Sequence, residues 1–227
     1  MGRSYNEGMD PIASLDSFTA KWRARWPEWT PAMAFVPASQ RERVAAWFAL
    51  LQELTDAAWG GADPTPGLAK LAWWQDELGG WAKGARRHPL GAVLQPQAAP
   101  WLQFARSLPA LQSSRMRPGE AASPTDLGTF ADAVAACEVA LFALSHRDDS
   151  GAAGRVVLHS LQAEQRLHHQ DTAAANRDGD GMPAPSSAGT RPRRIHAAIL
   201  RARLRRPGQR PSSWRALLPA WRAARGR

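Results

Sequence analysis

Two stretches in the first half of the sequence place large apolar residues three or four positions apart, which is the spacing of one face of an α-helix. The two stripes consist of Val44, Trp47, Phe48, Leu51, Leu54 and Ala58, and of Leu68, Leu71, Trp74, Leu78 and Trp81. Gly60 and Gly61 predict the end of the first helix, and Thr65 with Pro66 predicts the start of the second. Such long apolar stripes must be buried, so we expect the helices of residues 44–59 and 68–81 to pack together.

The composition also favours an all-α protein. Of the 227 residues, 44% are apolar, which suffices for the core of one large domain. Alanine and leucine, the strongest helix formers, are abundant, whereas β-branched residues are few. Eleven tryptophans beside a single tyrosine require either close packing or a broad apolar cavity. Because no strand pattern and no glycine-rich phosphate loop occurs, a Rossmann or P-loop enzyme is not indicated.

Helix-start signals divide the rest of the chain. Pro11 opens a first helix, and Ser39 with Glu42 forms a capping-box pattern before the stripe that begins at Val44. Further helices are expected after His88 and Pro89, from Pro100, from Ser123 to about residue 145, and from Gly154 to His169. Residues 171–194 have almost no large apolar side chain. They are predicted to form a flexible loop between a helical bundle of residues 1–170 and basic helices in residues 195–227.

The single cysteine and the lack of long apolar runs bear on the location of the protein. Cys137 lies in an apolar run and is interpreted as a buried, unreactive thiol. No internal disulfide is possible, which suits a reducing cytoplasm. There is neither a signal-peptide-like segment at the beginning nor a run of about 18 apolar residues. We expect a cytoplasmic protein, peripheral at most to the inner face of the membrane.

The charge of the chain is strongly asymmetric. Residues 191–227 contain twelve arginines and no acidic residue, whereas residues 1–190 contain 17 basic and 20 acidic residues, a net charge of −3. Three interpretations of the basic end stay open. Its apolar residues Ile195, Ile199, Leu200 and Leu204 can pack on the bundle. Alternatively, Trp214, Trp221 and the arginines can contact anionic lipid, or the arginines can bind nucleic-acid phosphates, for which no motif is present.

A resemblance to a known family lies in residues 35–94. Residues 70–78 read KLAWWQDEL, and Gly84 and then His88-Pro89-Leu90 follow. The order and spacing of these residues resemble the pattern KLxWWRxEL…G…HPV of squalene/phytoene synthases. The preceding stretch FVPASQRERVAAWFALLQELTDAAW is similar to the helix that carries the first aspartate motif of that family.

The resemblance implies a helical bundle of the isoprenoid-synthase type around a deep apolar cavity. It also implies head-to-head condensation of two prenyl diphosphates, with magnesium ions held by two aspartate-rich helices. Magnesium is a hard cation that prefers oxygen ligands, and it neutralises the diphosphate as it leaves. In this sequence the resemblance points to Lys70, Trp73, Trp74 and His88 as substrate-binding residues. Trp47, Trp73, Trp74 and Trp81 either line the cavity or pack in the core.

The carboxylates that the family uses are mostly missing. Thr55 and Trp59 stand at the two metal-holding positions of the first motif, and only the middle acid, Asp56, is kept. Glu53 lies one turn before Asp56, so the two form a candidate metal pair on one helix face. The alternative is that they belong to an ordinary polar face. If the family alignment holds, both side chains should point into the bundle rather than into bulk solvent.

The second motif matches weakly. Gln165 and His169 stand where the family has an Asn and the first Asp, and the downstream acid falls in the predicted loop. Glu164 and His168 are four positions apart, a spacing seen in helical metal sites, with His169 and Asp171 nearby. A Glu/His turn of this kind is more often an ordinary surface feature.

The sequence therefore predicts a squalene/phytoene synthase-like protein with impaired or lost prenyl transfer and a retained apolar-ligand or scaffold role. Two alternatives stay open. One is an active prenyltransferase that condenses two prenyl diphosphates and uses magnesium at Glu53 and Asp56. The other is a non-catalytic assembly or interaction factor that binds a protein partner through the Arg-rich C-terminal end. A mitochondrial branch of the resembled family, which assembles respiratory complexes, is an analogy for such a role. Magnesium is expected only in the active form. The expected partners are a prenyl diphosphate or another apolar ligand, and an anionic membrane surface at the Arg-rich end.

Overall fold

Helix α3, Arg41–Trp59, is the central element of the structure, a computed structural model that describes residues 11–115, 127–142, 150–168, 187–205 and 217–225. Between residues 44 and 59, every side chain except that of Asp56 is buried. An amphipathic helix would expose one face. The burial of nearly the whole circumference of α3 shows that other helices cover it on all sides.

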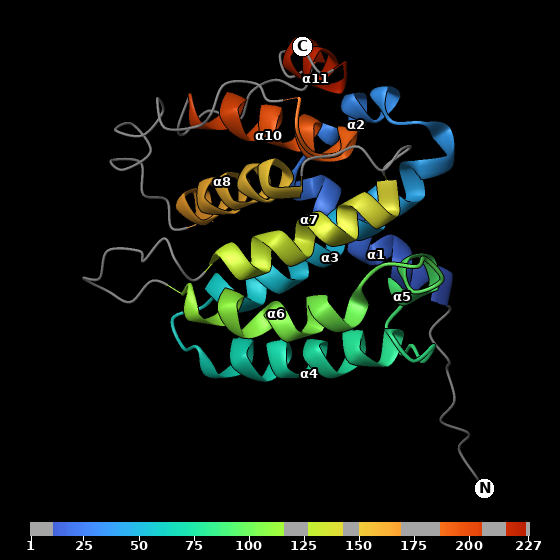
Figure 1. The fold of residues 1–227 in the computed structure, drawn as a ribbon, viewed down its shortest axis with the longest axis vertical. Helices are drawn as coiled ribbons and strands as arrows, with labels where there is room; N and C mark the ends of the chain where they lie inside the picture. Colours follow the sequence, from blue (N-terminus) through green and yellow to red (C-terminus); the bar gives the residue numbers. More distant parts are fainter. Residues whose placement is uncertain (1–10, 116–126, 143–149, 169–186, 206–216, 226–227) are drawn as a thin grey trace, which may run out of the picture.

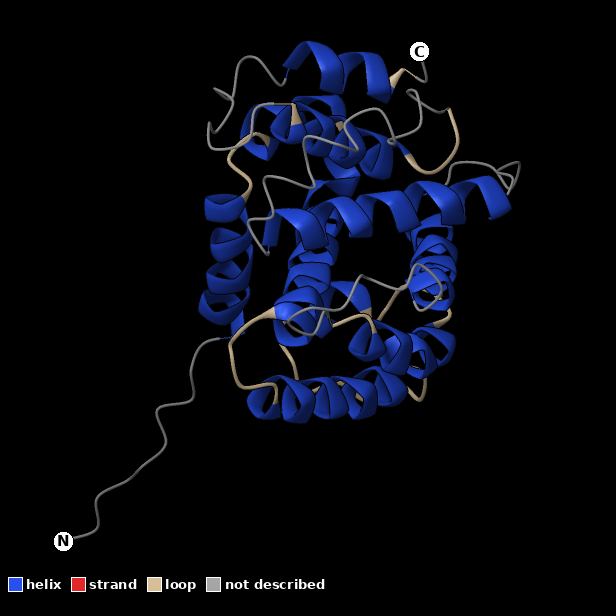
Figure 2. Ribbon diagram, turned by 90° about the vertical axis from the view of Figure 1, so that its left-hand side faces the viewer, coloured by secondary structure: helices blue, strands red, loops and turns tan. Residues whose placement is uncertain are grey.

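The other helices surround α3 in successive layers. They are α1 (Pro11–Arg25), α2 (Trp29–Ala32), α4 (Thr65–Trp81), α5 (Gly91–Leu94), α6 (Trp101–Ser113), α7 (Leu127–Phe142), α8 (Ser150–His168), α10 (Arg191–Leu204) and α11 (Leu217–Ala224). Along the long axis, α4 and α6 lie side by side at one end, α7, α8 and α10 follow, and α11 is outermost at the other end (Figure 1). The described part of the chain contains no strand (Figure 2), so the all-α prediction is confirmed.

The predicted packing of the two striped helices is also confirmed, because α3 contacts α4 directly. The tryptophans fill the space between the helices. Trp47 of α3 packs against Trp101 and Phe104 of α6, with ring centroids 6.3 and 5.4 Å apart. Trp81 of α4 meets Trp101 edge to face at 5.1 Å. Trp22, Trp29, Trp47, Trp74 and Trp81 are all fully buried. The large rings thus serve core packing, where aromatic pairs add to the free energy of burial.

Helix α10 is part of the core, although it is rich in arginine. Its apolar residues Ile195, Ile199, Leu200 and Leu204 are buried, as the packing interpretation of the basic end predicts. In addition, Arg193 is fully buried and forms an ion pair with Glu138 of α7, whose carboxylate also accepts a hydrogen bond from Trp47 Nε1 at 2.9 Å.

Two further polar contacts hold α10 in place. Arg203 donates hydrogen bonds at 2.9 and 2.6 Å to the buried carboxylate of Glu28, and its guanidinium lies 4.0 Å from the ring centroid of Trp26. His196 forms a hydrogen bond of 2.8 Å with Glu164 of α8. Buried charges are tolerated when they are paired in this way, so Arg203 and the Glu28 carboxylate stabilise each other, and the hydrogen bond from His196 to Glu164 adds a second polar contact.

Some local predictions need correction. The predicted capping box of Ser39 and Glu42 does not form. A 3-10 turn, Ala38–Gln40, leads into α3, and the residue before the helix makes no side-chain capping bond. Helix α10 begins at Arg191, four residues before the predicted boundary, because the Thr190 side chain accepts a hydrogen bond from the Arg193 N–H. Cys137 is buried as predicted, and burial raises the pKa of its thiol. The predicted loop lies mostly outside the described residues.

We expect Arg193→Met to lower the free energy of unfolding by roughly 3–5 kcal/mol, because it leaves the Glu138 carboxylate buried without its cation. Urea denaturation followed by circular dichroism measures the change. The double variant Glu138→Gln/Arg193→Met should regain most of the loss, since the amide is neutral and still accepts from Trp47. Arg155→Met, which alters an exposed arginine of α8, serves as the control. A loss below about 1 kcal/mol for Arg193→Met would contradict the assigned role of the pair.

Candidate functional site

The candidate metal ligand Glu53 is held by two lysines. Its Oε1 lies 2.6 Å from Nζ of Lys21 in α1, and its Oε2 lies 2.5 Å from Nζ of Lys70 in α4. The Glu53 side chain is only 6% exposed, so it points into the bundle and not into bulk solvent. Both carboxylate oxygens are therefore occupied by ammonium groups of the same chain.

Asp56 is held in a similar way. Its Oδ2 lies 3.5 Å from Nζ of Lys21, and its Oδ1 accepts a hydrogen bond of 3.2 Å from Arg25. Arg25 also contacts Nδ1 of His168 in α8 at 3.2 Å. Lys21, Arg25, Glu53, Asp56 and Lys70 are called the carboxylate cluster below. With three cations and two anions, the cluster has a net charge of +1.

The local geometry of two helices creates the cluster. Glu53 and Asp56 are three positions apart on α3, and Lys21 and Arg25 are four positions apart on α1, so each pair lies on one helix face. Because α1 packs against α3, the two faces meet. Glu53, Asp56 and Lys70 were predicted from the sequence as site residues, whereas Lys21 and Arg25 were not. Their four-residue spacing was a detectable signal, although nothing in the sequence showed which helix they would face.

The contacts within the cluster favour the charged forms of Glu53 and Lys21. Burial alone would raise the pKa of Glu53, but the hydrogen bonds from Lys21 and Lys70 outweigh it and lower the pKa. Burial likewise acts to lower the pKa of Lys21, and the contacts with Glu53 and Asp56 raise it overall. The ion pairs stabilise the charged forms of both partners. The Glu53 carboxyl group is therefore ionised and is not available as a proton donor.

Trp59 fills the space next to the cluster. Its side chain is buried, and its Nε1 donates a hydrogen bond of 3.0 Å to Oγ of Ser114 at the end of α6. Gln165 of α8 donates to the backbone oxygen of Ser114 at 2.6 Å, and the rings of Trp59 and His168 lie edge to face. The ends of α3 and α8, which carry the two motif-like segments, thus meet around a buried indole. His169 lies outside the described residues.

The four proposed substrate-binding residues all belong to or follow α4, but they have different surroundings. Lys70 pairs with Glu53, as described above. Trp74 is buried, whereas Trp73 is 39% exposed and has the Arg87 guanidinium 5.5 Å above its ring. His88 packs between Phe18 of α1 and Trp74, with both ring centroids 4.5 Å away. The structure therefore brings Trp73, Trp74 and His88 together in one aromatic group, with Trp74 buried and Trp73 at its exposed edge.

The motif around Glu77 has a structural role that explains its spacing. The Glu77 carboxylate accepts hydrogen bonds from the backbone N–H groups of Arg87 and His88, at 2.6 and 2.8 Å, and from Nε1 of Trp81 at 2.9 Å. Burial acts to raise the pKa of Glu77, but these bonds and the Arg87 guanidinium outweigh it and lower the pKa to about 2. Gly84 has a φ of 82°, which side chains other than glycine rarely adopt. Glu77 and Gly84 thus fix the turn that positions His88.

Glu164 and His168, whose spacing is one seen in helical metal sites, contact different helices. Glu164 bonds His196 of α10, whereas His168 contacts Arg25 of α1. Among the described residues, no group of three or more His, Cys, Asp or Glu side chains is placed to hold a metal ion. Asp171, the remaining member of the suggested site, lies outside them. The same part of the chain contains no helix long and apolar enough to cross a membrane.

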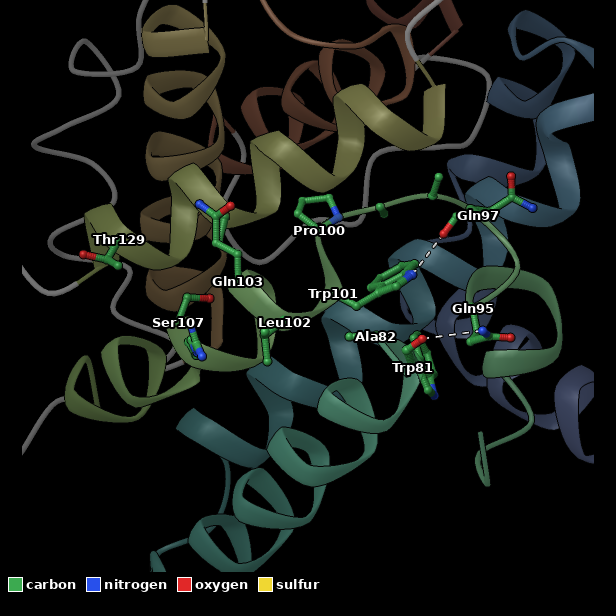
Figure 3. A pocket seen from close by; sticks show the side chains of 14 residues that line it. Trp81, Ala82, Gln95, Gln97, Pro100, Trp101, Leu102, Gln103, Ser107 and Thr129 are labelled. Atoms are coloured by element: carbon green, nitrogen blue, oxygen red, sulfur yellow. Dashed lines mark hydrogen bonds between the residues drawn. The ribbon is translucent and has the colours of Figure 1, made fainter. Parts of the chain in front are cut away.

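A separate hollow of about 730 Å³ lies at the junction of α4, α6 and α7. Figure 3 shows Trp81, Pro100, Trp101 and Leu102 along its wall. Trp101 donates its indole N–H to a backbone oxygen at 3.1 Å, so the rings present mainly apolar surface. Arg106 also lines the hollow. The volume is in the range typical of small-molecule sites. No residue of the carboxylate cluster takes part in the lining.

Comparison of the chain with family models, with curated proteins and with solved structures finds no match. The likeness to squalene/phytoene synthases therefore rests on the residues quoted above.

His88 is expected to make the stability of the protein depend on pH. Burial lowers its pKa from 6.5 to about 4, although the carboxylates of Glu77 and Glu53 act to raise it. The pKa of His88 is lower in the folded protein than in the unfolded chain. His88 therefore contributes its full share to the free energy of unfolding above pH 6.5, and this contribution is lost as the pH falls towards 4. His88→Asn should flatten this part of the profile by roughly 1 kcal/mol per pH unit, while its amide oxygen can still accept from the Leu90 N–H.

Urea denaturation of the unaltered protein and of His88→Asn at a series of pH values measures how steeply the free energy of unfolding depends on pH in each. At lower pH, where Glu77 titrates, the free energy of unfolding should decrease equally in both proteins, and this shared decrease serves as the internal control. Equal slopes between pH 6.5 and 4 would show that His88 is not the group responsible.

Proposed function

We propose that this chain is a squalene/phytoene synthase-like protein with an isoprenoid-synthase type of bundle, in which magnesium-dependent prenyl transfer has been lost and apolar-ligand binding remains. The observation that carries the proposal is the carboxylate cluster. The side chains of Lys21, Arg25 and Lys70 occupy the carboxylate oxygens that a magnesium ion would require.

The residues of the cluster do not fit magnesium for two reasons. The first is electrostatic, since the ion would enter a site of net charge +1 and would have to displace cations that lie 2.5 to 3.5 Å from the oxygens. The second is steric, because Trp59 stands where the family has an aspartate and its indole is buried against Ser114. Magnesium prefers octahedral coordination by oxygen, which neither lysine nor tryptophan provides.

The hollow beside Trp81 and Trp101 supports the retained binding role. Its wall is mostly apolar, and it offers one cation, Arg106, for a polar end group. Eight tryptophans of the described chain are buried in the core, and two of them, Trp81 and Trp101, also line this hollow. We assign an elongated apolar ligand to it. A role as an assembly scaffold without a small ligand is the alternative that would remain if ligand binding fails.

Purified protein with farnesyl or geranylgeranyl diphosphate and magnesium is expected to form neither squalene nor phytoene. Extraction and mass spectrometry of the apolar products measure the outcome. Formation of either product at about 1 s⁻¹ or faster, a rate ordinary for enzymes, would refute the proposed loss. In that case Glu53→Gln should abolish the activity, and Glu42→Gln, an exposed glutamate on the same helix, should not. This outcome would establish the active alternative.

Farnesol, which has the prenyl chain without the diphosphate, is expected to bind in the absence of magnesium. Leu102→Asp should weaken binding about tenfold or more, because it places a charge on the apolar wall. Leu68→Asp is the matched control, since Leu68 is similarly exposed but lies on α4 away from the hollow. Isothermal titration calorimetry gives the three dissociation constants. Equal weakening by both variants, or no binding by the unaltered protein, would contradict the assignment of the hollow.

A further inference from the structure

Helix α11 exposes a stripe that is half apolar and half basic. Leu218, Trp221 and Arg222 of α11 and Arg225, in the turn directly after it, follow one another at steps of three, one and three positions, so they lie on one side of the helix. All four are exposed, Leu218 by 54% and Trp221 by 36%. On the other face, Ala220, Ala223 and Ala224 are buried, and α11 packs there against α10 and α2. These four exposed residues are called the α11 stripe.

The stripe lies at an extreme of the molecule. Helix α11 is the outermost helix at its end of the long axis and lies next to α10 (Figure 1). It belongs to the segment of residues 191–227, which has twelve arginines and no acidic residue. Two of those arginines are used inside the fold, since Arg193 pairs with Glu138 and Arg203 with Glu28. Within the described part of the chain, Arg222 and Arg225 have no carboxylate partner.

We propose that the α11 stripe docks the protein on a membrane surface that contains anionic lipid. Leu218 and Trp221 supply the apolar contact, and an indole is well suited to the boundary between headgroups and acyl chains. Arg222 and Arg225 pair with lipid phosphates or carboxylates. The Arg225 guanidinium already lies 4.4 Å from the ring centroid of Trp221, so charge and apolar surface reach the bilayer together.

The charge distribution of the chain determines how the docked protein is oriented on the membrane. Residues 1–190 have a net charge of −3 and are repelled by an anionic surface, while the basic end is attracted to it. Docking through α11 places the acidic body farthest from the membrane. The exposed Leu218 favours lipid over nucleic acid, since phosphates and bases gain little from an aliphatic side chain. With one leucine and one tryptophan, the contact is peripheral, reversible and sensitive to salt.

Vesicle flotation with the full-length protein tests the proposal. Vesicles of phosphatidylcholine with about one-quarter phosphatidylglycerol should bind it, and binding should decrease at high salt. Arg222→Gln/Arg225→Gln should lower the partition coefficient by about fivefold for each arginine removed. Leu218→Ser/Trp221→Ser should weaken binding by at least tenfold through the loss of apolar contact. Leu68→Ser/Arg155→Gln, which alters exposed residues of α4 and α8, is the matched control and should bind like the unaltered protein.

Several results would overturn the proposal. These are absence of binding to anionic vesicles, equal binding to vesicles of phosphatidylcholine alone, and equal losses in the stripe and control variants. Binding to an RNA or DNA oligonucleotide without binding to vesicles would assign the stripe to nucleic acid and would also overturn it. Because the altered side chains are exposed, circular dichroism should confirm that all variants are folded. The test does not depend on the hollow or on the carboxylate cluster, so its failure would leave the proposed function unaffected.

Discussion

The buried ion pair between Glu138 and Arg193 is the contact on which the arrangement of the helices depends. Through it α7 is joined to α10, and through the hydrogen bond from Trp47 to Glu138 both are joined to the central helix α3. An unpaired charge at this depth would be strongly destabilising. Displacing either α7 or α10 alone would therefore leave a buried charge without its partner. The contacts of Glu164 with His196 and of Glu28 with Arg203 act in the same direction. A segment with twelve arginines is therefore partly inside the fold, and only its outer face is available for other partners.

The pairing of buried charges also determines what the carboxylate cluster can bind. Glu53 and Asp56 lie on the face of α3 that meets α1, with the Glu53 side chain buried and that of Asp56 partly exposed. In this chain, lysine and arginine side chains of α1 and α4 neutralise them. The carboxylate charges that would attract magnesium instead form ion pairs that join α3 to α1 and α4. The buried Trp59 occupies the adjacent space. The proposed binding at the hollow and the proposed docking at the α11 stripe involve separate surfaces, one largely apolar and one mixed apolar and basic.

Elements whose signals are local were predicted well. The spacing of Val44, Trp47 and Leu54 identified α3, Gly60 marked its end, and Thr65 with Trp81 bounded α4. The order of Glu77, Gly84 and His88 also has a local cause, a turn closed by one carboxylate and a glycine of positive φ. The capping box at Ser39 failed although it is a local signal, because the chain enters α3 through a 3-10 turn. The start of α10 was missed because Thr190 was read as part of a loop.

The sequence by itself determined the helical class, the extent of α3 and α4, the asymmetry of charge and the scarcity of aspartates at the motif positions. Each of these follows from composition or from spacing within a few turns. Only the tertiary structure decided which charges meet. Lys21 and Glu53 are 32 positions apart, and Glu138 and Arg193 are 55 apart. With 29 basic and 20 acidic side chains, many pairings are possible, and the angle at which two helices cross selects among them. That selection turned the candidate metal ligands into partners of lysine and arginine, and it left the stripe of α11 facing outward.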